Sequence, residues 1–422
     1  MQQKQSVAFH TLGCKLNFSE TSTLSRMVAA EGFENKPFET EADIYVINTC
    51  SVTENADKEC RQIIRRIQKR APAGMVVITG CYAQLKAKEI AEIPGVDLVL
   101  GAAEKFNLPH HLSLLGKADD TKISSCEISE VHEFHTSFSV DDRTRSFLKV
   151  QDGCDYNCSF CTIPLARGKS RSDTIPSVIK TAEMLAGKGV KEVVLTGINL
   201  GDFGNNQTNE RQENLIDLLR ALDELSGIER FRISSIEPNL LTENIIQFIS
   251  ESKKFMPHFH IPLQSGSDTI LGLMRRRYRK NLYAEKISRI KSLMPHCAIG
   301  VDVIVGFPGE TDQHFMETVD FIHSLDISYL HVFTYSERTN TKALEITPVV
   351  PVHERNRRNK LLRNLSYEKM AVFSNQFSGT TRPVLFESLQ KNGMMQGYSD
   401  NYIRVSAPYN EDCENRVISW KL

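Results

Sequence analysis

The sequence has no long apolar run, no excess of one charge and no apolar core near its first residues. It contains 51 Lys and Arg against 52 Asp and Glu among 422 residues, so any contact with nucleic acid must come from local patches. No apolar run is long enough to span a membrane, and residues 1–6 (MQQKQS) lack the apolar core of a signal peptide. We therefore expect a cytoplasmic protein with no membrane partner.

Cysteine is the residue type that most needs an explanation. The chain has ten cysteines, and without an export signal metal binding or catalysis explains them better than disulfides do. Cys154, Cys158 and Cys161 follow the spacing Cys-x3-Cys-x2-Cys, which can hold three irons of a [4Fe–4S] cluster. No fourth Cys or His follows at the spacing of a zinc site. One iron would stay open to an external ligand, which suits a cluster that takes part in chemistry.

The first part of the chain alternates short apolar segments with helical patterns. Strands are expected at 6–12, 43–48, 75–79 and 96–100, and helices at 17–31 and 54–70. This alternation predicts right-handed βαβ units and a parallel sheet in an α/β domain over residues 1–116. Residues 117–142 are polar and without a period, and are expected to form an irregular linker.

After the linker the alternation returns six times, in a core domain expected over residues 143–370. Strands are expected at 147–150, 193–196, 231–236, 258–262, 300–305 and 329–334, with helices such as 215–225 and 282–293 between them. Six βα units are too few for a closed eight-stranded barrel and predict a partial (β/α)6, TIM-like barrel. Its active site should lie at the carboxyl ends of the strands, where the loop with Cys154 begins.

A third pattern follows a long helix expected at 354–377. Short alternating segments at 381–387, 394–398 and 402–406, broken by turn residues, predict a small antiparallel β-domain over residues 371–422. The fold class is therefore a multidomain α/β protein.

A second set of cysteines shares one structural position. Cys14, Cys50 and Cys81 each lie just past a predicted strand of the first domain. Because the carboxyl ends of neighbouring parallel strands lie side by side, these thiols should converge. They are either small buried side chains, which is common for Cys, or the ligands of a second cluster, and their shared placement favours the cluster. The four remaining cysteines share no such geometry and are taken as structural: Cys60, Cys126, Cys297 and Cys413.

The first triplet resembles that of the radical S-adenosylmethionine (SAM) enzymes, in which SAM binds the open iron. The order of the domains, ending in a TRAM β-domain, resembles the radical SAM methylthiotransferase family. Four segments are most similar to its branch that acts on N6-threonylcarbamoyladenosine: TLGCKLN (11–17), LTGINLG (195–201), SSIEP (234–238) and MRRRY (274–278). The resemblance implies that this nucleoside, next to the tRNA anticodon, receives a 2-methylthio group by C–H activation and sulfur insertion.

The same resemblance implies the cofactors and partners. It gives one [4Fe–4S] cluster to Cys154, Cys158 and Cys161, an auxiliary one to the second triplet, and SAM as cosubstrate. It also implies a tRNA anticodon stem-loop as partner and a reductant such as flavodoxin or ferredoxin. We expect a monomer.

Several residues at predicted strand ends are candidates for SAM binding. Phe160 matches the aromatic residue that packs near the adenine in the family, and core packing is the alternative for it. The other candidates, whose alternative is a structural role, are Gly197, Ser235, Glu237, Gln264, Ser265 and Gly306. Asn340 stands where the family generally has a Gly-Thr pair, and Asn tolerates the left-handed conformation expected there.

Two local patches are candidates for RNA binding. The first holds cations that could contact phosphates and a tyrosine that could stack on a base, namely Arg275, Arg276, Arg277 and Tyr278. The second is a possible basic and aromatic surface of the last domain with Arg382, Tyr402 and Arg404. A solvated helix start and a solvated sheet face are the alternatives.

Other functions remain open at this point. The same chemistry could act on isopentenyladenosine in tRNA or on a ribosomal protein. A non-catalytic iron–sulfur protein that binds RNA or senses redox state is the alternative from another class.

Overall fold

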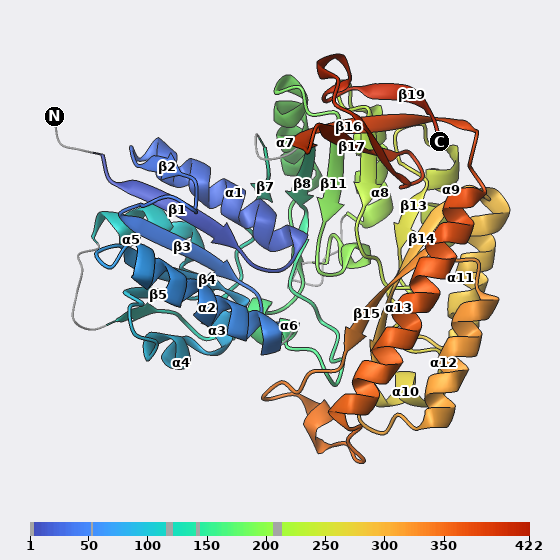
Figure 1. The fold of residues 1–422 in the computed structure, drawn as a ribbon, viewed down its shortest axis with the longest axis horizontal. Coiled ribbons are helices and arrows are strands. Elements are labelled where there is room, and N and C mark those ends of the chain that lie inside the picture. The colour runs from blue at the N-terminus through green and yellow to red at the C-terminus, as the bar shows by residue number, and fades with distance from the viewer. Residues whose placement is uncertain (1–3, 52–53, 115–120, 141–143, 206–212) are drawn as a thin grey trace.

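The computed structural model describes residues 4–51, 54–114, 121–140, 144–205 and 213–422. Figure 1 shows an α/β domain at the N-terminus, a half-open barrel in the middle of the chain and a small β-sheet at the C-terminus. None of the described helices is long and apolar enough to cross a membrane.

The N-terminal domain is built on a parallel six-stranded sheet, which confirms the predicted βαβ alternation. Its strand order is β2-β1-β3-β4-β5-β6. Leu24 and Leu108 pack helices α1 and α5 on one face, and Ile63 and Ile67 pack helix α2 on the other. The elements are β1 (Ser6–Thr11), α1 (Lys15–Ala30), β2 (Glu34–Lys36), β3 (Ile44–Thr49), α2 (Glu54–Arg70), β4 (Met75–Gly80), α3 (Cys81–Leu85), α4 (Ala87–Ala91), β5 (Leu98–Leu100), α5 (Leu108–Ser113) and β6 (Lys122–Ser124).

The core is a half-barrel of six parallel strands. β8, β11 and β12 pair with one another, as do β13, β14 and β15, and a parallel bridge between Ser235 and His260 joins the two groups. The strands are β8 (Arg145–Lys149), β11 (Glu192–Thr196), β12 (Arg230–Ile233), β13 (His258–His260), β14 (Ala298–Val305) and β15 (Tyr329–Thr334). The helices outside them are α7 (Ile175–Gly187), α8 (Leu215–Glu224), α9 (Glu243–Glu251), α10 (Asp268–Leu273), α11 (Lys280–Leu293), α12 (Asp312–Ser324) and α13 (Val352–Asn375).

The two faces of these strands have different environments. One side of each strand, including Leu148, Val193 and Phe259, enters the apolar core under the helices. The other side faces the interior of the half-barrel, which we call the lumen; Phe147, Val194, His258, Asp302 and Ile304 line its pockets. The alternation follows from the two-residue period of a β-strand.

The segment expected to be an irregular linker contains two short strands. β6 extends the N-terminal sheet, and β7 (Ser137–Phe138) pairs antiparallel with β8. Sheet edges carry unpaired backbone groups, so a polar segment can pair with them without a hydrophobic pattern. The expected domain boundaries at residues 116 and 142 lie outside the described residues.

The C-terminal sheet is antiparallel, as predicted, with the order β18-β17-β16-β19. Its strands are β16 (Thr381–Lys391), β17 (Met394–Ser399), β18 (Arg404–Pro408) and β19 (Val417–Lys421). It packs on the starts of the barrel strands, because Arg230 and Arg232 donate to backbone carbonyls of β17 and its flanks. This contact places the sheet at the end of the lumen opposite to the Cys154 loop.

A buried ion cluster joins the N-terminal domain to the barrel. Glu20 of α1 accepts from Lys105 at 2.6 Å, from Lys149 of β8 at 3.2 Å and from Arg167 at 3.0 Å. Arg167 also reaches Asp152 at 2.9 Å. Although burial opposes it, Arg167, Lys105 and Lys149 hold the pKa of Glu20 well below its usual value. The carboxylate therefore stays charged among three cations.

Replacing this carboxylate tests its importance for stability. In Glu20→Ala three buried cations lose their shared counterion, so the free energy of unfolding should fall by about 3–5 kcal/mol. Chemical denaturation measures the change. Glu31→Ala, at the exposed end of the same helix, should change it by less than about 0.5 kcal/mol. Equal losses in the two variants would show that the ion cluster is not needed.

Candidate functional site

The first cysteine triplet lies in a loop fixed at the carboxyl end of β8. The loop runs between β9 (Gln151–Asp152) and α6 (Ile163–Arg167), and β10 (Arg171–Ser172) pairs with β9. The Ser159 hydroxyl donates to the carbonyl of Leu273 at 2.7 Å, which fastens the loop to the end of α10. The thiols therefore sit where the barrel geometry predicts an active site.

Each thiol of this triplet receives a hydrogen bond from the protein. The Tyr156 amide donates to Cys154 Sγ and the Ile163 amide to Cys161 Sγ, both at 3.4 Å, while Arg276 Nη1 donates to Cys158 Sγ at 3.1 Å. Burial raises the pKa of Cys154 and of Cys161 to about 12. Three partly enclosed thiols with donors on sulfur fit an iron–sulfur cluster, whose metal ions favour the thiolate form.

A cavity of about 220 Å³ lies directly beside Cys161. Phe160, Gln264, Asp302 and Ile304 line it, together with Thr162, Ile163, Phe333, Thr334, Tyr335 and Ser336. Phe160 packs edge-on against Phe307 with ring centroids 6.2 Å apart, so it belongs both to the cavity wall and to a small apolar cluster. The cavity thus brings two of the expected SAM contacts, Phe160 and Gln264, next to the thiols.

The other expected SAM residues divide into those close to the triplet and those that are not. Glu237 forms an ion pair with Arg276, which itself bonds Cys158. Ser235 bonds His260 Nδ1 at 2.6 Å, on the lumen side. Ser265 is fully buried and its hydroxyl lies 3.2 Å from that of Thr318 in α12.

The two glycines face protein groups in this structure. A Cβ on Gly197 would lie 2.9 Å from Gln151 Oε1, and one on Gly306 would lie 2.3 Å from Arg355 Cγ. Gly306 has a φ of +72°, and Asn340 a φ of +65°, as expected for Asn at that position. The close approach at both glycines is to a neighbouring side chain.

The second triplet converges because of the sheet register. Thr11 pairs with Asn48 and Thr49 pairs with Gly80, which places the carboxyl ends of β1, β3 and β4 side by side. A Cβ on Gly13 would lie only 2.5 Å from Cys50 Cβ. Burial raises the pKa of Cys81, and Cys14 adds to that shift. Gly13, the residue before Cys14, thus lies against Cys50, and three thiols at neighbouring strand ends fit a three-ligand cluster.

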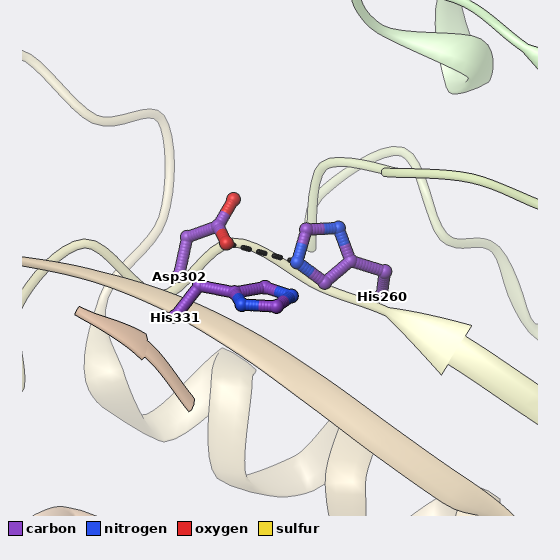
Figure 2. A group of neighbouring side chains, drawn as sticks. All are labelled: His260, Asp302 and His331. Atoms are coloured by element: carbon purple, nitrogen blue, oxygen red, sulfur yellow. Dashed lines mark hydrogen bonds and ion pairs between the residues drawn. The ribbon is translucent and has the colours of Figure 1, made fainter. Parts of the chain in front are cut away.

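A polar group that the sequence reasoning missed stands on the wall of the lumen. His260, Asp302 and His331 have ligand-type atoms within 4.8 Å of one another, and Figure 2 shows their side chains pointing toward each other. His260 Nε2 lies 2.9 Å from Asp302 Oδ1. The signal available in the sequence was the two-residue period of a strand, since each of these residues lies between two apolar neighbours along its strand.

A second cavity, of about 330 Å³, opens beside Cys14. Its lining comes from the N-terminal domain, the starts of the barrel strands and the C-terminal sheet: Thr11, Gly13, Cys14, Lys15, Phe18, Arg145, Phe147, Val194, Arg232, Ile233, His258 and Tyr402. Burial lowers the pKa of Lys15, with Asp302 among the groups that oppose the shift.

The structure corrects part of the first expected RNA patch. Tyr278 is buried, and its hydroxyl donates to the carbonyls of Pro262 and Leu263, so the ring cannot stack on a base. Arg276 is also buried, between Cys158 and Glu237. Alternate residues of this run turn inward, and the run of similar cations in the sequence did not indicate which residues would be buried. Arg275 and Arg277 remain exposed.

The second expected RNA patch is also divided. Tyr402 stacks on His258 with ring centroids 3.9 Å apart and lines the cavity beside Cys14, so it faces the lumen and not an open sheet surface. Arg382 forms a bidentate pair with Asp400. Arg404 is exposed and bonds Gln396 at 3.0 Å.

Known protein families match both domains that carry the cysteine triplets. Residues 6–101 match the model of Uncharacterized protein family UPF0004, and residues 148–322 match that of the Radical SAM superfamily. A Bacillus subtilis protein named threonylcarbamoyladenosine tRNA methylthiotransferase MtaB is 40% identical over 99% of this chain and 93% of its own. The chain belongs to the radical SAM methylthiotransferase family. Its membership implies a [4Fe–4S] cluster and SAM.

Two further relatives and one solved structure are also similar to this methylthiotransferase. An Aquifex aeolicus protein of the same name as the Bacillus one is 39% identical over 94% of this chain and 96% of its own. A Syntrophus aciditrophicus protein named tRNA-2-methylthio-N(6)-dimethylallyladenosine synthase is 31% identical over 92% of this chain and 85% of its own. The radical SAM methyltransferase TsrM of Kitasatospora setae superposes with a TM-score of 0.57 at 15% identity, covering 78% of this chain and 73% of its own, which shows a shared fold.

The contact between Arg276 and Cys158 can be tested without RNA. Arg276→Met removes the donor to Cys158 Sγ and leaves Glu237 unpaired. With SAM and dithionite, 5′-deoxyadenosine formation should fall at least about tenfold while iron is retained, since a charged hydrogen bond contributes about 1.5–3 kcal/mol. Arg275→Met, one residue away and exposed, is the control and should keep the rate. An unchanged rate in Arg276→Met would show that Arg276 does not contribute to 5′-deoxyadenosine formation.

Proposed function

We propose that this protein converts N6-threonylcarbamoyladenosine next to the tRNA anticodon to its 2-methylthio derivative, and that it uses two [4Fe–4S] clusters. The observation that carries the proposal is that two three-cysteine sets adjoin cavities of the same lumen. Near-complete alignment with proteins named for this reaction supports it.

The first triplet supports the radical part of the reaction. A [4Fe–4S] cluster with SAM supplies a 5′-deoxyadenosyl radical, which can act on an aromatic C–H bond that acid–base chemistry does not activate. Cys154, Cys158 and Cys161 would hold this cluster. Phe160 and Gln264 line the neighbouring cavity and would orient SAM, and the apolar wall around Phe160 would exclude water.

The second triplet supports the transfer of sulfur. Cys14, Cys50 and Cys81 provide three ligands, and a cluster held by three ligands offers an iron position for a sulfur ligand. Arg167 and Lys105 lie near Cys81 and oppose the burial that raises its thiol pKa. These cations favour the anionic state that a cluster and its thiolates need.

The partners follow from the same proposal. Arg275 and Arg277 are exposed beside the Cys154 loop, where Arg277 lies over the ring of Tyr156 at 3.9 Å. They and Arg404 would contact phosphates of the anticodon stem-loop. A reductant such as flavodoxin or ferredoxin would deliver the electron to a monomeric enzyme in the cytoplasm.

Nucleoside analysis tests the reaction directly. Anaerobically reconstituted protein should contain about eight irons per chain, and Cys154→Ala and Cys14→Ala about four each. After incubation with SAM and dithionite, mass spectrometry should show 2-methylthio-N6-threonylcarbamoyladenosine only with the unsubstituted protein. Cys14→Ala should still form 5′-deoxyadenosine, because the first triplet is intact. Methylthiolation of dimethylallyladenosine or of ribosomes alone would overturn the substrate assignment.

The close contact at Gly13 gives a second test with a matched control. Gly13 and Gly32 have φ of +98° and +93°, so alanine brings similar backbone strain of about 1–3 kcal/mol to either position. Only at Gly13 does the new Cβ meet Cys50; nothing lies within 4 Å at Gly32. Gly13→Ala should therefore bind about four irons and Gly32→Ala about eight. Equal iron contents would contradict a cluster at the second triplet.

A further inference from the structure

Lys15 is a cation without a partner inside a cavity whose other cations are paired. It is the first residue of α1, directly after Cys14, and its side chain is accessible to the space of the 330 Å³ cavity. Arg145 pairs with Glu387 at 2.9 Å and Arg232 with Glu192 at 2.8 Å. The Lys15 ammonium forms no hydrogen bond or ion pair with the described residues.

The rest of the cavity suits a small group with both apolar and polar parts. Phe18, Phe147 and Val194 give it apolar walls, and Thr11 contributes a hydroxyl. His258 also lines it, and within the described part of the chain its buried Nδ1 has no hydrogen-bond partner. Unpaired polar groups in an enclosed site cost free energy that a ligand carrying complementary groups can offset.

The position of the cavity relates it to the reacting nucleoside. Cys14 lines this cavity, and Asp302, which bonds His260, lines the cavity beside Cys161. Figure 2 shows His331 against this pair, with its ring centroid 5.5 Å from that of His260. A base held between the two triplets can therefore extend a substituent toward Lys15.

We propose that Lys15 is the specificity-determining residue that binds the carboxylate of an amino-acid substituent on the adenine N6. This inference rests on the proposed function and deepens it. A threonylcarbamoyl group carries a carboxylate for the ammonium, a methyl group for the apolar wall and a hydroxyl for Thr11 or His258. A dimethylallyl group has no polar atom and would leave the ammonium unpaired and desolvated.

Two anticodon stem-loops separate a role in recognition from a role in folding or cluster binding. One carries threonylcarbamoyladenosine and the other its carboxyl methyl ester, which removes the charge and adds only one methyl group. The unsubstituted holoprotein should bind the acid at least tenfold more tightly than the ester. Lys15→Met should weaken binding of the acid about tenfold to a hundredfold and change that of the ester less than threefold.

Control variants distinguish loss of carboxylate recognition from a general loss of structure. Lys15→Arg should retain most of the affinity for the acid, and Lys180→Met, on the exposed side of α7, should match the unsubstituted protein. Iron content and 5′-deoxyadenosine formation with SAM alone should stay unchanged in Lys15→Met. Equal loss for acid and ester, or no loss for either, overturns the inference.

The two proposals fail in distinguishable ways. If the unsubstituted protein methylthiolates threonylcarbamoyladenosine but Lys15→Met keeps its preference for the acid, only the role of Lys15 is refuted. If the unsubstituted protein modifies dimethylallyladenosine and not threonylcarbamoyladenosine, the proposed function fails and the role of Lys15 with it.

Discussion

The ion cluster around Glu20 is the constraint on which the rest of the structure depends. Helix α1 starts directly after Cys14, and α6 starts two residues after Cys161. Arg167, the last residue of α6, donates to Glu20 and, at 2.6 Å, to Asn17 on α1. Charges buried this deeply require close pairing, so the contact allows little variation in geometry. The relative position of the two thiol sets follows from this contact.

The C-terminal sheet acts at the other end of the lumen. Arg232 donates to the carbonyls of Ser399 and Asp400 and pairs with Glu192, while Tyr402 stacks on His258. These contacts hold the sheet against the starts of the barrel strands and place the Tyr402 ring in the same cavity as Lys15. A domain whose surface composition suggests RNA contacts thus also shapes the interior in which the nucleoside would react.

Sequence patterns predicted elements better than the directions of individual side chains. The strands that precede Cys14, Cys50 and Cys81 were identified from apolar alternation. The register of the parallel sheet then places the carboxyl ends of these strands side by side. Tyr278 and Ser265 were placed in the correct loops, yet both side chains turn into the protein. A motif at a strand end specifies the loop, whereas the packing of neighbouring helices decides which side chains face the cavity.

The sequence by itself determined the first cysteine triplet, because its spacing is local, and the strands, because the period of a strand is set by the backbone. It identified two three-thiol sets, a parallel sheet, a half-barrel and an antiparallel C-terminal domain. Only the tertiary structure decided what shares the lumen. Lys15 and Tyr402 line one cavity, and His260 and Asp302 form a pair, although no local sequence pattern indicates that these residues lie together. Their proximity results from packing of the domains, which depends on contacts distant in sequence.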